Sequence, residues 1–222
     1  MSSYEAKKHY QDGEVARRYN AQYKDPLNLS NFRDKLVGWG EVRAFQKMLR
    51  HVPRGGSVLD VACGTGRYLK QLLDCGYKVY GLDISDEMLE FAREVTQGDP
   101  NIQLLKKGDA ENLPFNDNQF DGVTCIRLYQ RVPPAQRLQM LREVKRVARS
   151  WAILFFGMSN SWLIVRQAIR WKLISGRLNN PNALTVTEMR QELLRAGLKL
   201  EESTWVLPGI ASGMIVRVSL CD

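Results

Sequence analysis

The stretch Val58-Leu59-Asp60-Val61-Ala62-Cys63-Gly64-Thr65-Gly66-Arg67 decides the fold of this chain of 222 residues. It begins as an apolar run, passes through a turn of small residues and continues into a helical pattern. Gly64 and Gly66 lack Cβ atoms, so the turn can take unusual dihedral angles and approach a ligand closely. In an open α/β sheet, ligands bind at the carboxyl ends of the strands. The stretch therefore predicts a strand, a ligand-binding turn and a helix.

Short apolar runs alternate with amphipathic segments downstream of this stretch. The pattern predicts strands at residues 57–61, 78–82, 101–105, 120–125 and 151–156, and helices at 66–74, 86–96 and 135–149. Such alternation is typical of a mostly parallel sheet with right-handed crossovers. A helix at 187–196 is followed by strands at 198–206 and 213–220 with no helix between them. These two strands predict an antiparallel hairpin at the edge of the sheet.

Two further segments with the apolar spacing of a helix precede the core, at residues 4–23 and 32–51. We therefore expect one α/β domain that fills residues 1–222. Its expected parts are an N-terminal helical cap at 1–52, a cofactor-binding core at 53–156, an acceptor lid or insertion at 157–186, and a C-terminal helix and hairpin at 187–222.

The composition narrows the class of protein. Apolar residues make up 44% of the chain, no apolar run reaches eighteen residues, and the polar N-terminus lacks the core of a secretory signal. The scattered cysteines favour reduced thiols over disulfides or a zinc site, so we expect a cytoplasmic protein without a metal; they are Cys63, Cys75, Cys125 and Cys221. A net charge of +8 fits a basic surface kept for solubility, or contact with nucleic acid or an anionic membrane.

The glycine-rich turn does not match the common nucleotide-binding motifs. A dinucleotide fingerprint needs a third glycine where this chain has Leu69, and a P-loop needs a Gly-Lys-Ser/Thr sequence that is absent. Asp60 precedes the turn, and a fixed carboxylate there disfavours a pyrophosphate and favours a cation. S-adenosylmethionine carries a sulfonium and an ammonium group, so the electrostatics favour this methyl donor over NAD.

Three successive strand ends each carry a carboxylate: Asp60, Asp83 and Asp109. Asp83 lies 17 residues after Gly66, about the separation at which an acidic residue binds both ribose hydroxyls in Rossmann-type sites. The alternative role for Asp83 is an N-cap of the next helix, for which Ser85 is better placed. Asp109 suits an exocyclic amine such as that of adenine, or the local structure of an Asx-turn.

These segments, with Phe120-Asp121-Gly122-Val123, resemble class I S-adenosylmethionine-dependent methyltransferases, over roughly residues 40–156. The resemblance is greatest to the small-molecule group that includes ubiquinone and menaquinone biosynthesis methyltransferases. It implies a Rossmann-like α/β fold with a seven-stranded, mostly parallel sheet, an antiparallel last strand and helices on both faces. The residues that it assigns to the cofactor site are Asp60, Ala62, Gly64, Gly66, Asp83, Ile84, Met88, Asp109, Ala110, Ile126 and Arg127.

The resemblance implies a role for most of these residues. Gly64 and Gly66 lie beside the methionine part of the cofactor, and Asp83 binds the ribose. Asp109 and Ala110 flank the adenine, while Ile84 and Met88 pack on its ring. Ile126 and Arg127 line the cleft near the transferable methyl. One of the tyrosines at 10, 19 and 23 closes over the cofactor.

The chain departs from the resemblance after the fourth strand, where many relatives carry histidines. It reads Arg127-Leu128-Tyr129-Gln130-Arg131-Val132-Pro133-Pro134 there, and its two histidines, His9 and His51, precede the core. Tyr129 is the nearest candidate for a general base, with a pocket-shaping aromatic as its alternative role. Methyl transfer can proceed mainly through alignment of the nucleophile with the sulfonium, so a missing base does not exclude catalysis.

The segment at residues 161–177 has no acidic residue and carries a basic stripe beside an apolar face. It predicts a lid over the acceptor pocket, a basic amphipathic helix on an anionic membrane, or a helix that binds a partner. We therefore expect methyl transfer to a small-molecule or lipid-like acceptor. The alternatives are methylation of RNA or protein, and a non-catalytic module that binds the cofactor. Nucleic acid is the less favoured partner, because no RNA-binding domain or RNA-methyltransferase motif is recognisable.

Overall fold

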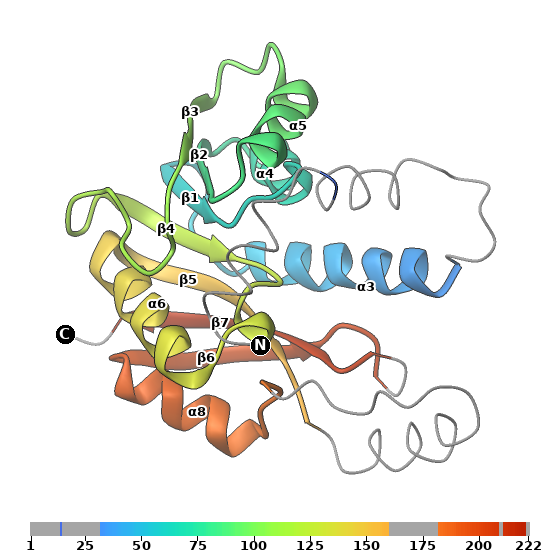
Figure 1. Cartoon of the computed structure of the whole chain (residues 1–222), viewed down its shortest axis with the longest axis vertical. Coiled ribbons are helices and arrows are strands. Elements are labelled where there is room, and N and C mark those ends of the chain that lie inside the picture. The colour runs from blue at the N-terminus through green and yellow to red at the C-terminus, as the bar shows by residue number, and fades with distance from the viewer. Residues whose placement is uncertain (1–13, 15–31, 160–181, 209–210, 221–222) are drawn as a thin grey trace.

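The computed structural model describes residues 14, 32–159, 182–208 and 211–220. The described elements, in chain order, are α3 (Phe32–Leu49), β1 (Ser57–Val61), α4 (Arg67–Asp74), β2 (Lys78–Asp83), α5 (Asp86–Thr96), β3 (Ile102–Lys107), β4 (Phe120–Cys125), η2 (Tyr129–Arg131), α6 (Pro134–Val147), β5 (Ala148–Gly157), α8 (Val186–Arg195), β6 (Leu198–Trp205) and β7 (Gly213–Leu220). Figure 1 shows their arrangement. The helix predicted at 4–23 and most of the predicted lid lie outside the described residues.

One seven-stranded sheet organises the described part, with the strand order β3-β2-β1-β4-β5-β7-β6. The pairs among β1 to β5 are parallel, whereas β7 pairs antiparallel with both β5 and β6. The predicted mostly parallel sheet with an antiparallel last strand is therefore confirmed. The chain order reverses between β1 and β4, and the carboxyl ends of these two neighbours form a topological switch point.

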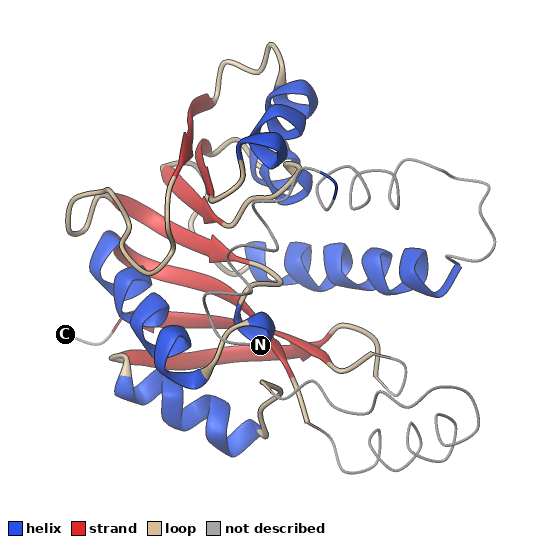
Figure 2. Cartoon of the chain, viewed as in Figure 1, coloured by secondary structure: helices blue, strands red, loops and turns tan. Residues whose placement is uncertain are grey.

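Helices cover both faces of the sheet, as the sequence pattern predicts (Figure 2). On one face, Phe45 and Met48 of α3 join Leu69 and Leu72 of α4 and Leu89 of α5 in a buried apolar cluster. On the other face, a second cluster contains side chains of α6 and α8, including Leu141, Val144, Met189 and Leu193. The parallel strands are buried from both sides, which explains their continuous apolar runs.

Helix α6 ends earlier than its apolar period predicts. The prediction runs to residue 149, but the helix ends at Val147 and β5 begins at Ala148. Ala148 has extended dihedral angles, is fully buried and pairs with Phe120. The apolar residues at 144, 147 and 148 therefore serve a helix and then a strand, and their spacing alone does not mark the boundary.

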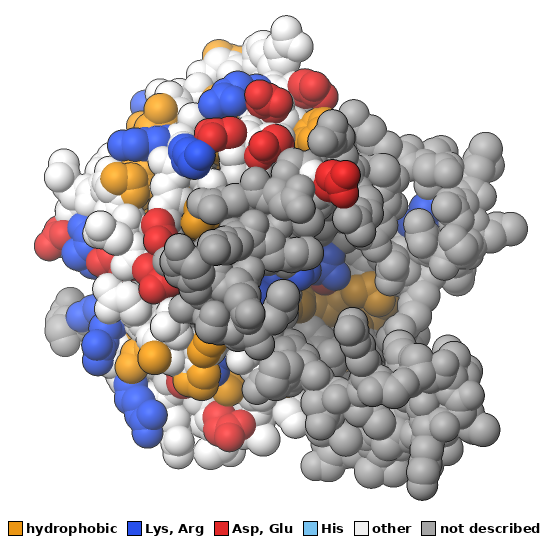
Figure 3. All heavy atoms as spheres, in the orientation of Figure 1, with side chains coloured by type: hydrophobic (Ala, Val, Ile, Leu, Met, Phe, Trp, Pro, Cys, Tyr) orange, Lys and Arg blue, Asp and Glu red, His pale blue; other side chains and the backbone are white. Residues whose placement is uncertain are grey.

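Basic and acidic side chains are interspersed on the face of the molecule in Figure 3, among the described residues. Several of them form surface ion pairs, such as Lys107 with Asp86 and Arg149 with Asp121. Within the described part of the chain, no helix is both long and apolar enough to cross a bilayer.

Candidate functional site

A cavity lies at the carboxyl ends of β1, β2 and β4, at the switch point of the sheet. Its empty volume is about 1080 Å³, part of which is open to solvent. Nine of the eleven predicted cofactor residues line it: Ala62, Gly64, Asp83, Ile84, Met88, Asp109, Ala110, Ile126 and Arg127. Residues from four separate segments of sequence thus meet at one place, as the positions of the strand ends predict.

Asp83 is locked in place by the backbone around it. Its Oδ2 accepts a hydrogen bond from the Gly64 N–H at 2.8 Å, and its Oδ1 accepts one from the Ser85 N–H at 3.0 Å. The side chain is 7% exposed, and burial raises its pKa although these two donors oppose the effect. The Ser85 hydroxyl accepts a bond from the Met88 N–H and caps α5, so the predicted preference for Ser85 over Asp83 as the N-cap is confirmed.

Two backbone positions of the cavity wall take left-handed dihedral angles without being glycine. Ala62 has φ of +57° just after β1, and Arg127 has φ of +68° shortly after β4. Such angles cost a non-glycine residue of the order of 1–3 kcal/mol and concentrate at functional sites. Gly64, with φ of +56°, shares this turn, and a Cβ built on it would meet no atom within 4 Å. The space that this Cβ would fill is open for a ligand.

Asp60 and Gly66, the other two predicted residues, are not among the lining residues of the described cavity. Gly66 has φ of +84° and caps α4, and a Cβ there would lie 3.1 Å from the Cα of Ala92 on α5. Gly66 therefore allows α4 and α5 to pack closely, and its contact with the methionine part stays a prediction. Both glycines are needed in the turn, but for different physical reasons.

Asp60 is 1% exposed, and its Oδ1 accepts a hydrogen bond from the Thr124 hydroxyl at 2.6 Å. Its Oδ2 has no hydrogen-bond partner among the described groups. Burial, with a smaller contribution from the charge of Asp83, raises the pKa of Asp60 to about 7 although the Thr124 bond lowers it. Asp60 therefore lies behind the wall of the described cavity, and its predicted role beside a cationic ligand stays a prediction.

Asp109 forms the Asx-turn that is one of the two roles predicted for it, and its bond to an exocyclic amine stays a prediction. Its Oδ1 accepts the Glu111 N–H at 3.0 Å, which is the bond of an Asx-turn. The residue also lines the cavity, together with Ala110 and Glu111. The Asx-turn therefore fixes the carboxylate at the cavity wall.

Tyr129 does not reach the cavity, which contradicts its predicted role as general base. The residue is fully buried in η2, stacks on Phe156 with a ring separation of 5.3 Å, and lies outside the lining. Burial and the neighbouring Cys125 thiol raise the pKa of its hydroxyl well above the ordinary value. The short helix turns this side chain into the core, and a deeply buried phenol is a poor proton acceptor.

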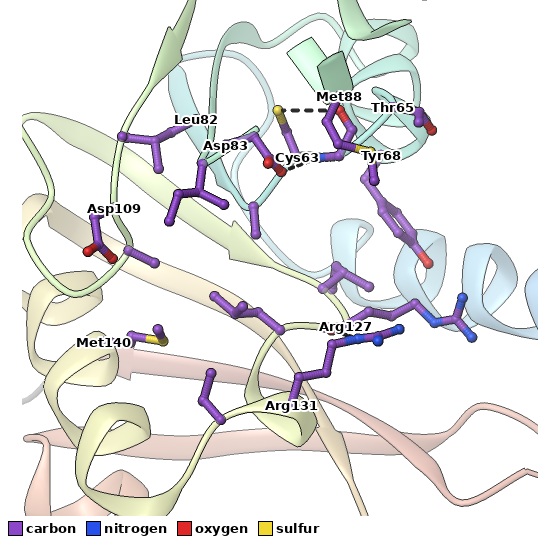
Figure 4. A pocket seen from close by; sticks show the side chains of 18 of the residues that line it. Cys63, Thr65, Tyr68, Leu82, Asp83, Met88, Asp109, Arg127, Arg131 and Met140 are labelled. Atoms are coloured by element: carbon purple, nitrogen blue, oxygen red, sulfur yellow. Dashed lines mark hydrogen bonds between the residues drawn. The ribbon is translucent and has the colours of Figure 1, made fainter. Parts of the chain in front are cut away.

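The lining also contains residues that the sequence analysis missed. Thr65 lies between the two glycines, and Arg67 and Tyr68 follow them. Arg131 and Val132 belong to the segment after β4, and Met140 belongs to α6. We call Asp83, Asp109 and Glu111 the carboxylate end of the cavity, and Arg67, Arg127 and Arg131 the arginine end. Figure 4 shows Asp109 well separated from Arg127 and Arg131.

A buried carboxylate from outside the core, Glu41 on α3, supports the arginine end. Its Oε1 lies 3.0 Å from Arg127 Nε, and its Oε2 lies 3.9 Å from Arg67 Nη1 and 3.3 Å from the Tyr68 hydroxyl. Glu41 is 1% exposed, and burial raises its pKa while Arg127 and Arg67 oppose the rise. Its position in a helix upstream of the core gave no motif signal.

Within the residues that the structure describes, no three His, Cys, Asp or Glu side chains are grouped as a metal ion requires. The described lining of the cavity offers carboxylates, backbone N–H groups and guanidinium groups. Cys63 also lines the cavity, and burial raises the pKa of its thiol, which disfavours the nucleophilic thiolate.

Sequence and structure comparisons agree with this geometry. Residues 58–150 match the family model of a methyltransferase domain. A demethylmenaquinone methyltransferase of Staphylococcus epidermidis is 36% identical over 131 residues, 55% of this chain and 53% of that protein. Its counterpart in Staphylococcus saprophyticus is 35% identical over 152 residues, 67% of this chain and 62% of that protein. The chain thus spans only about half to three fifths of the length of these relatives.

A solved structure shares the whole fold. Magnesium protoporphyrin IX methyltransferase from Synechocystis, solved with bound SAH, superposes with a TM-score of 0.73 over 96% of this chain and 97% of that chain. The sequence identity is 19%, so the likeness concerns the fold.

Proposed function

Because the chain belongs to the class I S-adenosylmethionine-dependent methyltransferases, we propose that it transfers a methyl group from S-adenosylmethionine to a small-molecule acceptor. The observation that carries this proposal is the joint arrangement of Gly64 and Asp83. A glycine with open space at its Cβ position is hydrogen-bonded at 2.8 Å to a buried carboxylate of the next strand end. A backbone that admits a ligand closely, beside a fixed acceptor for hydroxyl groups, suits an amino-acid moiety joined to a ribose.

We assign the parts of the cofactor along the cavity in the order of the strand ends. Asp83 accepts hydrogen bonds from the ribose hydroxyls, and Ile84 and Met88 pack on the adenine ring. Asp109 accepts a bond from the exocyclic amine beside Ala110. The apolar lining by Ile84 and Met88 and the fixed carboxylates of Asp83 and Asp109 support this order.

The methionine part then lies by Gly64, toward Ile126 and Arg127. The buried Oδ2 of Asp60, with no hydrogen-bond partner among the described groups, supports a cationic ligand nearby. The bound cofactor supplies a methyl carbon made electrophilic by a positively charged sulfur. The residues of this chain contribute orientation, which is the main requirement of a displacement at that carbon.

We propose a small acceptor with an apolar body, such as an aromatic ring system. The apolar side chains of the lining include Ile126, Leu128, Val132 and Met140. The names of the relatives, which are demethylmenaquinone methyltransferases, support an acceptor of this kind. A lid formed by residues 157–186, closure by an N-terminal tyrosine and peripheral membrane contact stay predictions, because those segments lie largely outside the described residues.

Calorimetric titration of the purified chain tests the proposal. We expect saturable binding of S-adenosylmethionine and none of NADH, because the turn lacks the third glycine, which allows close helix–strand packing in a dinucleotide site. Incubation with labelled S-adenosylmethionine and a panel of quinols, phenols and carboxylic acids then identifies acceptors through transfer of the label. Failure of a folded sample to bind S-adenosylmethionine would contradict the proposal. Binding without transfer to any acceptor class would favour the non-catalytic module.

A further inference from the structure

The arginine end of the cavity is more than a boundary of the cofactor site. Arg127 and Arg131 both come from the segment that follows β4, and both line the cavity. Figure 4 shows them together, away from Asp109 at the carboxylate end. The cavity is therefore polarised, with fixed carboxylates toward β2 and β3 and guanidinium groups toward β4 and α3.

Both guanidinium groups are held by the protein. Arg127 forms a 3.0 Å ion pair with the buried Glu41 through Nε, and Arg131 Nε donates to the Arg127 carbonyl oxygen at 3.2 Å. A guanidinium has five N–H donors in a rigid fork, so these bonds are compatible with a ligand on the other nitrogens. Rigid arginine forks suit the oxygens of carboxylates and other oxyanions.

The topology assigns this end to the second reactant. The proposed contacts with the adenine and the ribose come from the ends of β2 and β3, and the methionine part extends from Gly64 after β1 only to the near edge of the segment after β4, at Ile126 and Arg127. The methyl acceptor must approach the cofactor from elsewhere, and the segment after β4 is the part of the described lining on the other side of the switch point between β1 and β4. Arg127 and Arg131 lie in that segment.

The described lining offers no imidazole that could remove a proton from the acceptor. His51, the one histidine in the described part, is 2.5 Å from Glu202 Oε2 and does not line the cavity. Tyr129 is buried in the core. The acidic side chains of the lining lie at the end that we assign to the cofactor. An acceptor that is already ionised needs no base.

We propose that the methyl acceptor binds as an anion, with an ionised oxygen of a carboxylate, phenolate or enolate held by Arg127 and Arg131. This proposal rests on the proposed methyl transfer and names its substrate class. Positive charge within a few ångströms favours the ionised form of such a group, so its proton is lost to solvent on binding. A cationic amine acceptor is disfavoured at this end.

The transfer step balances without a base. A lone pair of the ionised acceptor forms the new bond to the methyl carbon while the carbon–sulfur bond breaks. The bonding pair stays on sulfur, which becomes a neutral thioether. The anion and the sulfonium lose their opposite charges together, and no proton moves in this step when the ionised oxygen is itself the nucleophile.

A matched pair of aromatic probes tests the proposal. The full chain is saturated with S-adenosylhomocysteine and titrated with 2-naphthoate and with its neutral isostere 2-naphthamide. We expect the wild type to bind the carboxylate in preference to the amide. Arg127→Gln and Arg131→Gln should each weaken 2-naphthoate by about tenfold or more and leave 2-naphthamide unchanged.

Arg149→Gln is the control, because it removes the same charge at the opposite, amino end of β5, where Arg149 pairs with Asp121. It should leave both probes unaffected. Arg131 is exposed, so its variant keeps the test valid if Arg127→Gln does not fold. Equal binding of the two probes by the wild type, or an equal effect of the variants on both, would overturn the proposal.

A further titration separates the acceptor from the carboxylate of the cofactor itself. S-adenosylhomocysteine carries that carboxylate and 5′-methylthioadenosine does not. If the variants weaken S-adenosylhomocysteine but neither 5′-methylthioadenosine nor 2-naphthoate, the arginines hold the cofactor and the proposal is wrong. If the wild type does not bind S-adenosylhomocysteine at all, the proposed function itself fails, which is a different result.

Discussion

The two ends of the cavity are built in different ways. At the carboxylate end, Asp83 and Asp109 lie within a few residues of a strand end and accept hydrogen bonds from nearby backbone N–H groups. At the arginine end, a helix from before the core supplies Glu41, which anchors Arg127 through an ion pair. One end depends on local backbone geometry and the other on side chains brought together from distant segments. A local geometry can be recognised from a motif, and a distant pairing cannot.

The largest expected effect concerns Asp60, the buried carboxyl group behind the carboxylate end, and the pH dependence that it gives to the free energy of unfolding. Because burial raises the pKa of Asp60 to about 7, the native state keeps this proton up to about pH 7, whereas the unfolded chain releases it near the ordinary value of 3.8. Between these values the native state binds more protons. The free energy of unfolding attributable to Asp60 therefore falls as pH rises through this window, by at most about 1.4 kcal/mol per pH unit, and levels off above it.

Asp60→Asn should remove this slope, since an amide does not titrate. Urea unfolding of wild type and variant from pH 5 to pH 8 measures the difference. The slope is the readout rather than the stability at one pH, because the amide brings its own cost of burial. If the free energy of unfolding varies with pH in the same way for both proteins, Asp60 is ionised over this whole range and its burial does not make stability depend on pH.

Two glycine substitutions in the same turn distinguish a glycine needed for fold stability from one needed for cofactor binding. Gly66→Ala should destabilise the fold by about 2–4 kcal/mol, because its φ of +84° disfavours a side chain and the new Cβ lies 3.1 Å from the Ala92 backbone. Gly64→Ala should cost only about 1–2 kcal/mol, because its Cβ meets open space, yet it should weaken cofactor binding. Chemical unfolding and titration with S-adenosylhomocysteine measure both.

The reverse pattern, with Gly66→Ala well folded but unable to bind and Gly64→Ala neutral for binding, would mean that the two roles are exchanged. Equal effects of the two substitutions on binding would mean that the whole turn contacts the ligand.

Asp83→Ala tests the carboxylate end directly. Loss of the charged acceptor should weaken binding of S-adenosylmethionine by about 1.5–3 kcal/mol, or roughly 10- to 150-fold. Asp86→Ala is the control, because it removes the same charge from an exposed position three residues later. Calorimetry on both variants provides the comparison. Unchanged affinity in a folded Asp83→Ala protein would remove this residue from the cofactor site.

The same difference between the ends explains what could be predicted from the sequence. The bounds of β1, α5 and β4 follow from clear apolar runs and caps, and the positions of Gly64, Asp83 and Asp109 follow from the rule that ligands bind at strand ends. Glu41 could not be found in this way. Its role depends on how α3 packs over the sheet, and a lone glutamate in an amphipathic helix normally points to solvent.

Three predicted site residues lie outside the described cavity lining for local reasons. Asp60 and Gly66 belong to the motif, but a motif does not tell which of its members face the cavity and which face the protein behind it. Tyr129 was selected because it follows β4 closely, and periodicity gave no sign of the short helix η2 that directs it into the core.

Tyr129→Phe should have the smallest effect and checks that Tyr129 is a core residue. The ring stack on Phe156 is retained, and the lost hydroxyl lies beside the Cys125 thiol, a weak hydrogen-bonding group. The free energy of unfolding should change by no more than about 1 kcal/mol, and the rate of methyl transfer to any acceptor used by the wild type should stay within about twofold between pH 7 and pH 9. Unfolding and steady-state kinetics measure the two quantities. A rate that drops by about 100-fold while cofactor affinity is unchanged would restore Tyr129 as the base, and the arginine end would then have to accept a protonated substrate.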